Sequence, residues 1–285
     1  MTLTRLQQIK NIIECPYCHS EIEWLKDYVL CEKCSCNFPI ESAVPIFYKP
    51  DVKSTAESRF QSEQMFDNTF TAKIYNKGRK LISSEFMPKN HILEFLKRTN
   101  SGDIIIEIGS GNRRLRGDVI NLDIFLFPNV DIVADGAKTP FKNNIVDFVV
   151  LDTVLEHVPE PHKIIKEIFR ILKPGGECIC IVPFIFPYHG YPAHYFNFSK
   201  DGLDFLFKDF SDCKVELNMG PTSAMVNLFS EYFAVAISGE NKFIYTLCKG
   251  AILIPTFFLK YLDVFWKPTG RGINIASHLC AVAKK

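Results

Sequence analysis

The stretch Ile104-Ile105-Ile106-Glu107-Ile108-Gly109-Ser110-Gly111 decides the fold of this chain. Its apolar run, broken only by Glu107, predicts a strand buried on both faces, as in a parallel sheet. The two glycines that follow allow a sharp turn and a close approach of the backbone to a ligand. Asp123 follows a second apolar run and suits the hydroxyl groups of a ribose. The sequence therefore predicts a site for a cofactor that contains a nucleoside.

Two cofactors are compatible with this pattern, a dinucleotide and S-adenosylmethionine. The dinucleotide fingerprint needs a third glycine and a helix whose N-terminus holds a pyrophosphate. Arg114 stands at the matching position, and the chain from Gly109 to Val119 is too short for a crossover helix. S-adenosylmethionine has no phosphate, and its carboxylate could meet Arg113 or Arg114. The residues favour S-adenosylmethionine, and a glycine turn with solvated arginines and no ligand is the alternative.

The chain beyond Asp123 continues to alternate between strands and helices. A helix is predicted to begin at Pro161 and to stop at Lys173-Pro174-Gly175-Gly176. Further strands are predicted at residues 131–135, 146–151, 178–182, 214–218 and 273–283. This order predicts an α/β fold with a doubly wound sheet.

The string ADGAKTPFKNNIVDFVVLDTVLEHVPEPHKIIKEIFRILKPGG, residues 134–176, resembles class I S-adenosylmethionine-dependent methyltransferases, particularly the group typified by quinone-biosynthesis enzymes. The resemblance implies a Rossmann-like seven-stranded methyltransferase sheet. It also implies roles for seven residues: Glu107, Gly109 and Gly111 at the methionine end, Asp123 at the ribose, Asp135 at the adenine amino group, and Asp152 and His157 near the methionine moiety or the acceptor. The first motif departs from the family because Arg113 replaces its usual third glycine.

Composition bounds the class of protein and its compartment. The chain has 285 residues, with 33 Lys and Arg against 32 Asp and Glu, so net charge gives no drive toward nucleic acid. Residues 1–14 lack the apolar core of a secretory signal, which predicts a cytoplasmic protein. Its 10 cysteines are then expected in metal or core roles rather than in disulfides, with Cys178 and Cys180 as buried thiols.

Two C-x2-C hooks near the N-terminus predict a structural Zn²⁺ site in a module of residues 1–48. The four predicted ligands are Cys15, Cys18, Cys31 and Cys34. Cys36 is a spare that could replace Cys34 or stay free, and a redox dithiol is the rival interpretation. The module is similar to zinc ribbons fused to methyltransferases. Several local acidic residues argue against RNA contact by this module.

The remaining segments are predicted to surround the cofactor domain. Residues 49–100 are expected to form a linker and helices that cover the cofactor, and residues 101–285 the methyltransferase domain. A helical insertion at 222–268 is almost wholly apolar, with its polar positions on one helical stripe. It could be a lid, a peripheral membrane contact or a homodimer interface. A spanning helix is not expected, because the uncharged run 250–259 is shorter than the roughly 20 residues required.

The acceptor side is predicted in the proline-rich loop after residue 182, where His189 and His194 are candidate general bases. The string PFIFPYHGYPAHYFNFSKDGLDFLF, residues 183–207, resembles methyltransferases encoded with cell-surface polysaccharide enzymes. We therefore expect methyl transfer to oxygen or nitrogen of a small or lipid-linked acceptor, such as a sugar. An rRNA or tRNA methyltransferase that reads RNA through the ribbon and a non-catalytic scaffold that binds S-adenosylmethionine are the alternatives.

Overall fold

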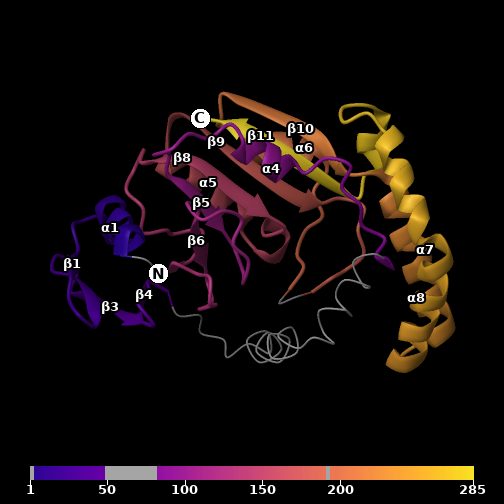
Figure 1. The fold of residues 1–285 in the computed structure, drawn as a ribbon, viewed down its shortest axis with the longest axis horizontal. Coiled ribbons are helices and arrows are strands. Elements are labelled where there is room, and N and C mark those ends of the chain that lie inside the picture. Colours follow the sequence, from indigo (N-terminus) through magenta and orange to yellow (C-terminus); the bar gives the residue numbers. More distant parts are fainter. Residues whose placement is uncertain (1–2, 49–81, 191–192) are drawn as a thin grey trace.

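The computed structural model describes residues 3–48, 82–190 and 193–285. Its centre is a seven-stranded mixed sheet, flanked by a small N-terminal sheet on one side and a helical hairpin on the other (Figure 1). The covering helices that the sequence predicts between residues 49 and 81 lie outside the described residues.

The central sheet is the Rossmann-like methyltransferase sheet that the resemblance predicts. Its strands run in the order β10-β11-β9-β8-β5-β6-β7, and β11 alone is antiparallel to both of its neighbours. Their bounds are β5 Ile105–Ile108, β6 Ile120–Asp123, β7 Ile132–Val133, β8 Val146–Asp152, β9 Leu172–Pro183, β10 Asp212–Met219 and β11 His278–Lys284. The carboxyl ends of β5, β6, β7, β8 and β9 therefore meet at one edge of the sheet, which we call the carboxyl edge.

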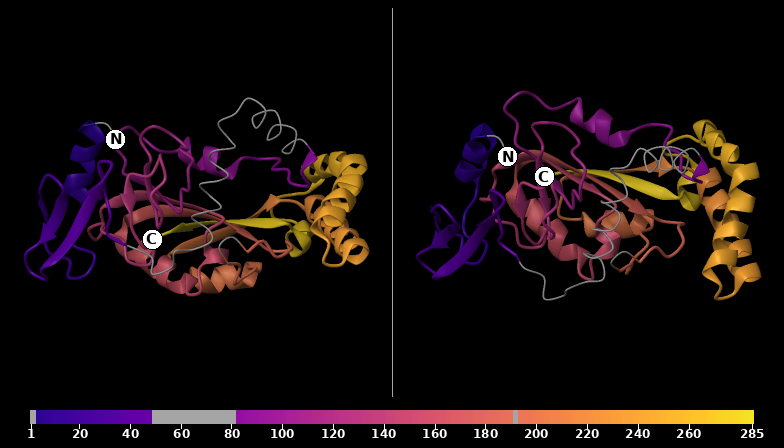
Figure 2. Two further views of the ribbon diagram at one scale, coloured as in Figure 1. Left: turned by 90° about the horizontal axis from the view of Figure 1, so that it is seen from below. Right: turned by 60° about the horizontal axis from the view of Figure 1, so that its bottom comes forward.

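Side chains alternate between the two faces of the sheet, so each face packs into a separate core. Ile105 packs with helix α4 (His91–Leu96), whereas Ile106 and Ile108 pack with the core that holds α5 (Pro161–Ile171). This follows from the two-residue period of a strand. Figure 2 shows α4 on one side of the sheet, with α5 and α6 (Lys200–Leu206) on the other. Both faces are covered, as a parallel sheet requires.

The helix before β9 begins and ends close to the predicted residues. Pro161 occupies the first turn of α5, and Ile164, Ile165 and Ile168 form its buried face. The helix ends at Ile171, and the Lys173-Pro174-Gly175-Gly176 stretch lies inside β9 rather than between helix and strand. A short 3₁₀ helix, η1 (Leu155–His157), precedes α5.

Two connections in the domain depart from a regular α/β unit. Residues 109–119, all of which the structure describes, join β5 to β6 without a helix, in agreement with the short first crossover that the sequence indicates. The last strand begins at His278 rather than at 273, because residues Arg271–Ile275 form the 3₁₀ helix η3. The prediction of a strand from 273 was wrong, since its apolar residues cover the end of β10 instead of joining the ladder.

The N-terminal module covers the free edge of the large sheet. It consists of α1 (Leu3–Ile12) and the antiparallel strands β1 (Glu23–Trp24), β2 (Tyr28–Cys31), β3 (Cys36–Glu41) and β4 (Val44–Pro45). Phe47 N–H donates to the Val133 carbonyl over 2.8 Å, and Ile46 bridges Val133 in parallel. The module thereby caps β7, the edge at which unpaired backbone groups would otherwise be exposed.

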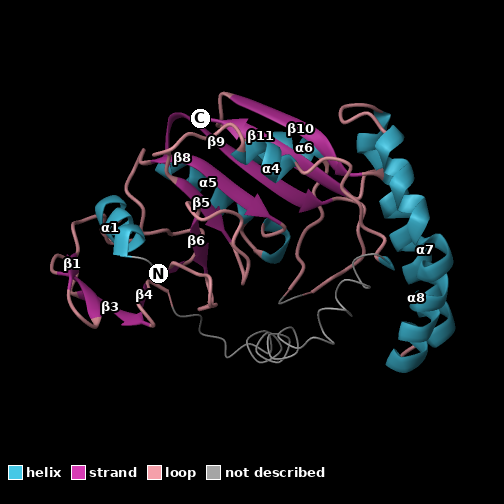
Figure 3. Cartoon of the chain, viewed as in Figure 1, coloured by secondary structure: helices cyan, strands magenta, loops and turns pink. Residues whose placement is uncertain are grey.

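The predicted insertion is a helical hairpin that stands off one end of the sheet (Figure 3). It contains α7 (Pro221–Ser238), α8 (Lys242–Thr256) and the 3₁₀ helix η2 (Phe257–Phe265). The change to 3₁₀ geometry follows Pro255, as expected for a proline inside a helix. The run Lys242–Phe265 is long and apolar enough to cross a membrane by length and composition. The charge-free run alone did not indicate this.

The polar stripe of the insertion faces the protein, and the apolar residues face outward. Lys249 Nζ binds Glu231 on α7 over 2.6 Å, and the buried Lys260 Nζ donates to the Ser83 carbonyl over 2.7 Å. The buried Asp263 carboxylate accepts the Thr222 N–H over 2.8 Å. The Lys249 and Asp263 bonds join elements of the hairpin to each other, and the Lys260 bond ties the hairpin to the segment before α4. They leave a row of large apolar side chains exposed, among them Phe229, Tyr232, Phe243, Leu247, Ile254, Phe258 and Phe265.

Candidate functional site

The glycine turn after β5 can be made only by glycine at its first position. Gly109 has φ +73°, and a Cβ there would lie 2.5 Å from Val154 Cγ2. Gly111 has φ +55°, and a Cβ there would meet no atom within 4 Å. The backbone of the turn therefore packs against the start of η1 at Gly109 and borders open space at Gly111. That is the geometry of a backbone cradle for a ligand.

Asp123 is joined to this turn through the backbone. At the end of β6, its Oδ2 accepts the Gly111 N–H over 2.8 Å and its Oδ1 accepts the Phe125 N–H over 3.0 Å. The residue is only 7% exposed, and burial raises the pKa of its carboxyl against the effect of these donors. The two parts of the predicted cofactor site are thus one structure at the carboxyl edge.

Arg113 lies across the predicted methionine end. Its guanidinium binds Glu107 Oε1 through Nε over 2.6 Å and Asp152 Oδ2 through Nη1. Glu107 is fully buried, and burial raises its pKa to about 6 although Arg113 acts against this shift. Its second oxygen, Oε2, has no hydrogen-bond partner among the described residues. The Arg113 side chain itself is 41% exposed, so it still presents N–H groups outward.

Arg114 has a different role from its neighbour. Both of its terminal nitrogens bind Asp131 over 3.1 Å, and they also donate to the carbonyls of Val119 and Asn129. The Asp131 carboxylate is almost fully buried and in turn accepts the Asn121 N–H over 2.9 Å. Arg114 therefore locks the short crossover that replaces a helix. Of the two arginines, only Arg113 faces the site.

The residues fit S-adenosylmethionine. The orphaned Glu107 Oε2 and the open space beside Gly111 suit a ligand with a polar end, and Arg113 suits a carboxylate on that ligand. Asp135 lies just after β7, where its Oδ1 accepts the Ala137 N–H over 2.8 Å. The predicted cofactor residues Glu107, Gly109, Gly111, Asp123, Asp135, Asp152 and His157 all lie at or just beyond the carboxyl ends of β5, β6, β7 and β8.

Three histidine rings and a buried glutamate gather beside this edge. The ring centroids of His157 and His189 lie 5.2 Å apart, and those of His189 and His194 lie 4.2 Å apart. Glu156 is fully buried beneath them, and its carboxylate, 3.8 Å from His189, raises the pKa of that histidine. Glu156 was not among the residues predicted from the sequence. Its position beside His157 was the only signal.

His194 is held within its own loop. Its Nδ1 accepts the His189 N–H over 3.2 Å, and its Nε2 donates to the Phe196 carbonyl over 3.0 Å. With both ring nitrogens engaged, His194 serves to position the loop. His189, the other predicted base, instead has its Nε2 3.8 Å from Glu156 Oε1.

The four predicted cysteine ligands converge in the N-terminal module. Cys15 and Cys34 sulfurs lie 3.5 Å apart, those of Cys18 and Cys31 lie 3.4 Å apart, and all four lie within 4.8 Å of one another. Tetrahedral Zn–S bonds of about 2.3 Å place sulfurs about 3.8 Å apart, so the group suits zinc. Cys36 pairs with Cys31 across β2 and β3 but lies outside this group.

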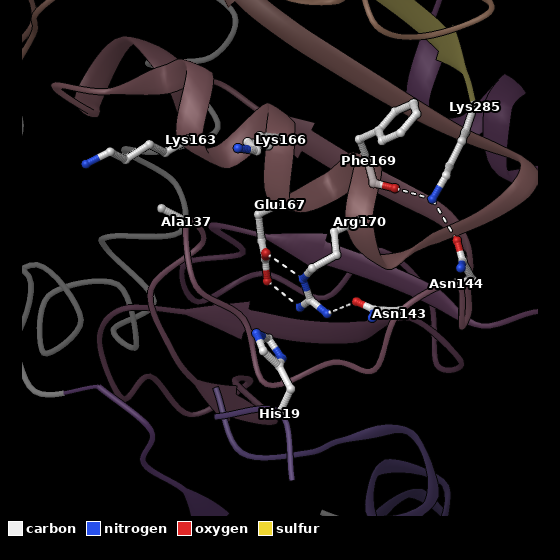
Figure 4. A pocket seen from close by; sticks show the side chains of 10 residues that line it. All are labelled: His19, Ala137, Asn143, Asn144, Lys163, Lys166, Glu167, Phe169, Arg170 and Lys285. Carbon is white, nitrogen blue, oxygen red and sulfur yellow. Dashed lines mark hydrogen bonds and ion pairs between the residues drawn. The ribbon is translucent and has the colours of Figure 1, made fainter. Parts of the chain in front are cut away.

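A separate cleft of about 630 Å³ lies between His19, helix α5 and Lys285 (Figure 4). It borders the amino ends of β8 and β9, opposite the carboxyl edge. Arg170 is paired with Glu167 over 2.6 Å, and Lys285 donates to Asn144 over 2.7 Å. Because its main cations already have partners, we assign no ligand to this cleft.

Comparison with known proteins finds methyltransferases. Residues 113–180 match the family described as "Methyltransferase domain". The ubiquinone/menaquinone biosynthesis C-methyltransferase of Rickettsia prowazekii is 36% identical over 62 residues, 21% of this chain and 25% of that protein. The tRNA (carboxymethyluridine(34)-5-O)-methyltransferase ALKBH8 of Macaca fascicularis is 25% identical over 174 residues, 52% of this chain and 24% of that protein.

Solved structures show a distant likeness in shape. Phosphoethanolamine N-methyltransferase 2 of Haemonchus contortus gives a TM-score of 0.45 at 16% identity, covering 85% of this chain and 62% of that one. A SAM-dependent methyltransferase of Archaeoglobus fulgidus gives 0.44 at 15% identity, covering 80% and 99%.

Residues 113–180 match a methyltransferase domain, and the sheet around them has the strand order of the predicted class I S-adenosylmethionine-dependent methyltransferase fold. The chain spans less than half the length of the curated relatives it matches, between 20% and 44%.

Proposed function

We propose that this protein transfers a methyl group from S-adenosylmethionine to oxygen or nitrogen of a small or lipid-linked acceptor. The observation that carries the proposal is the joined unit of Gly111 and Asp123 at the carboxyl edge. S-adenosylmethionine, when bound, supplies an electrophilic methyl group on sulfur and leaves as S-adenosylhomocysteine. The residues of the chain then have to hold, align and shield the two reactants.

Each cofactor residue has a distinct task in this proposal. Asp123 binds the ribose hydroxyls, and Asp135 faces the adenine amino group. Arg113 meets the methionine carboxylate, while Glu107 and Asp152 hold the guanidinium in place. Gly109 allows the backbone of the turn to lie close to Val154, because any side chain at this position would clash with Val154.

The acceptor is expected beside the loop that follows β9. This loop presents exposed aromatic side chains, Tyr188 at 78% and Tyr195 at 53%, next to the histidine rings. A hydroxyl or protonated amine must lose its proton to become a nucleophile. We propose that His189 accepts this proton, and that His194 positions His189 by accepting its backbone N–H.

The four cysteines are proposed to hold a structural Zn²⁺. Cys15 and Cys31 are buried in the same core as Ile106 and Phe141, so the metal would stabilise the contact between ribbon and sheet. This packing supports a structural role for the ribbon rather than RNA binding, because the ribbon packs against the edge strand β7. The tRNA enzyme among the relatives is the one observation that favours the RNA alternative.

The helical hairpin is proposed as a peripheral membrane contact of a cytoplasmic protein. Its exposed apolar faces suit the boundary between headgroups and acyl chains. The buried Lys260 binds its η2 end to the Ser83 carbonyl outside the hairpin, and the buried Asp263 binds that end to the start of α7, which supports lying on a bilayer rather than crossing it. A homodimer interface is the alternative use of the same face. A membrane position would bring lipid-linked acceptors to the carboxyl edge.

Isothermal titration with S-adenosylmethionine, S-adenosylhomocysteine and a nicotinamide dinucleotide tests the cofactor. We expect heat with the first two only. Incubation with extracts, with and without RNase and with a separated lipid fraction, then tests turnover and acceptor class through formation of S-adenosylhomocysteine and a methylated product. Binding without turnover in any extract would support a scaffold, and RNase-sensitive turnover would support the RNA alternative.

A further inference from the structure

Three side chains at the carboxyl edge converge without a donor between them. Glu156 is fully buried, and neither of its carboxylate oxygens has a hydrogen-bond partner among the described residues. The nearest groups are Nε2 of His189 at 3.8 Å and Nε2 of His157 at 3.9 Å from its Oε1. These gaps are too long for an N–H···O hydrogen bond. A buried carboxylate left in this state is costly unless something else satisfies it.

The hydrogen bonds on the far side of each ring set the tautomers. Nδ1 of His189 lies 3.2 Å from the Pro187 carbonyl, and Nδ1 of His157 binds the Ala193 carbonyl. A carbonyl only accepts, so each Nδ1 carries the proton and each neutral ring presents a bare Nε2 lone pair. Two lone pairs and a carboxylate then face one point, an arrangement that favours a positive charge there.

We propose that Glu156, His157 and His189 bind a divalent transition-metal ion, with Zn²⁺ as the first candidate. Two imidazoles and one carboxylate are a ligand set for zinc with an open position. Two metal–ligand bonds of about 2.1 Å can bridge gaps of up to about 4.2 Å, so the 3.8 and 3.9 Å separations admit an ion. The backbone carbonyls on Nδ1 are the outer contacts that orient metal-binding histidines.

His194 completes the arrangement without being a ligand. Its Nδ1 is taken by the His189 N–H, and its Nε2 donates within the loop. It therefore holds the loop that carries His189. His162, which is exposed on α5, provides the matched control. The structure also separates this site from the ribbon, whose four ligands are all sulfurs.

The open position indicates the ligand class. Resting on the proposed methyl transfer, we expect it to take an oxygen of the acceptor, and vicinal hydroxyls, as in a sugar or catechol, suit it best. A divalent ion lowers the pKa of a bound hydroxyl. The ion would then take over the role otherwise assigned to His189, whose Nε2 it occupies.

Metal analysis of the full chain tests this proposal. Protein equilibrated with Zn²⁺ and freed of excess should hold one equivalent beyond that bound by the cysteines. Glu156→Gln and His189→Gln should each lose that equivalent, with affinity reduced about 100-fold or more, since loss of even an outer contact costs roughly 10- to 100-fold. His162→Gln should keep it. Co²⁺ distinguishes the sites, because thiolate-to-metal absorption reports the ribbon alone.

Two outcomes would overturn the proposal. One is wild-type protein that binds only the single equivalent of Zn²⁺ held by the four cysteines. The other is retention of the additional equivalent by both Glu156→Gln and His189→Gln, with melting temperatures near that of wild type. Calorimetry with S-adenosylhomocysteine on the same samples is independent of this count, so a missing metal and a missing cofactor site are distinguishable.

Discussion

The Gly111 N–H donates to the Asp123 carboxylate over 2.8 Å, across 12 residues of chain that contain no helix. This bond joins the turn after β5 to the end of β6. The carboxylate accepts a second N–H, from Phe125, over 3.0 Å. Shape and charge of the proposed ribose site therefore depend on one side chain.

Replacing Asp123 with Asn should weaken S-adenosylhomocysteine binding by about 10- to 100-fold. The amide keeps the size of the side chain but loses its charge, and its NH2 group opposes a backbone N–H. Losing charged hydrogen bonds of this kind costs about 1.5–3 kcal/mol. Calorimetry measures the change. Asp118→Asn is the control, since that side chain is 50% exposed beside Arg116. Equal affinities for the two variants would contradict the assignment.

The two adjacent arginines should differ in what they affect. Arg113→Gln is expected to weaken cofactor binding about 10-fold or more, and to lower stability as well, because it removes the partner of the buried Glu107 carboxylate. Arg114→Gln removes the charged partner of a nearly buried Asp131, which keeps only the Asn121 N–H of the bonds described above, and should cost about 3 kcal/mol of unfolding free energy. Urea unfolding and calorimetry on both variants provide the comparison. A stability loss at Arg113 with none at Arg114 would reverse the roles of the two side chains.

Chelation of the ribbon metal should destabilise the whole domain. Cys15 and Cys31 belong to the same core as the central sheet, so the ribbon cannot unfold without exposing Ile13 and Phe141. A strong chelator should therefore lower the midpoint of a single melting transition. Cys31→Ser should reproduce the effect, whereas Cys36→Ser, which lies outside the sulfur group, should not. Two separate transitions would show that ribbon and sheet are independent.

Below neutral pH, the protein should lose stability through His278. Burial, with repulsion from nearby His189, lowers its pKa to about 3 from an ordinary 6.5. Between these two pKa values the unfolded chain binds a proton at His278 that the folded chain does not bind. The contribution of neutral His278 to the free energy of unfolding is therefore fully present above pH 6.5 and declines as pH falls toward 3. Between pH 7 and 5 the loss is roughly 2 kcal/mol. Urea unfolding should show this difference in wild type relative to His278→Gln, and parallel pH profiles would contradict it.

Local signals in the sequence predict much of the fold and half of the site. The apolar run before Gly109, Asp123 at the end of the next strand and the cysteine hooks depend on period and spacing, which are visible in one segment. The partners of Arg113 are not. Asp152 lies 39 positions away in the sequence and meets Arg113 only because β5 and β8 are neighbours.

Glu156 and His189 illustrate the same limit. Both residue types stand out in the sequence as possible site residues. However, the 3.8 Å distance between His189 Nε2 and Glu156 Oε1 depends on the loop after β9, which returns over η1. The hairpin's orientation was also beyond the pattern. A polar stripe normally indicates the solvated face of a helix, whereas in this hairpin Lys260 and Asp263 are buried and the apolar face is outside.

The exposed apolar face of the hairpin should bind membranes. Phe243, at 72% exposure, and Phe258, at 55%, lie on the outer face of α8 and η2. The double variant Phe243→Glu and Phe258→Glu should reduce flotation with anionic liposomes at least several-fold, because each change places a charge at the acyl boundary. Phe205→Glu is the matched control, since Phe205 is 71% exposed on α6, outside the hairpin. Light scattering of the free proteins checks the dimer alternative. If the double variant floats like wild type yet changes from dimer to monomer, the face is an interface between copies and the membrane proposal fails.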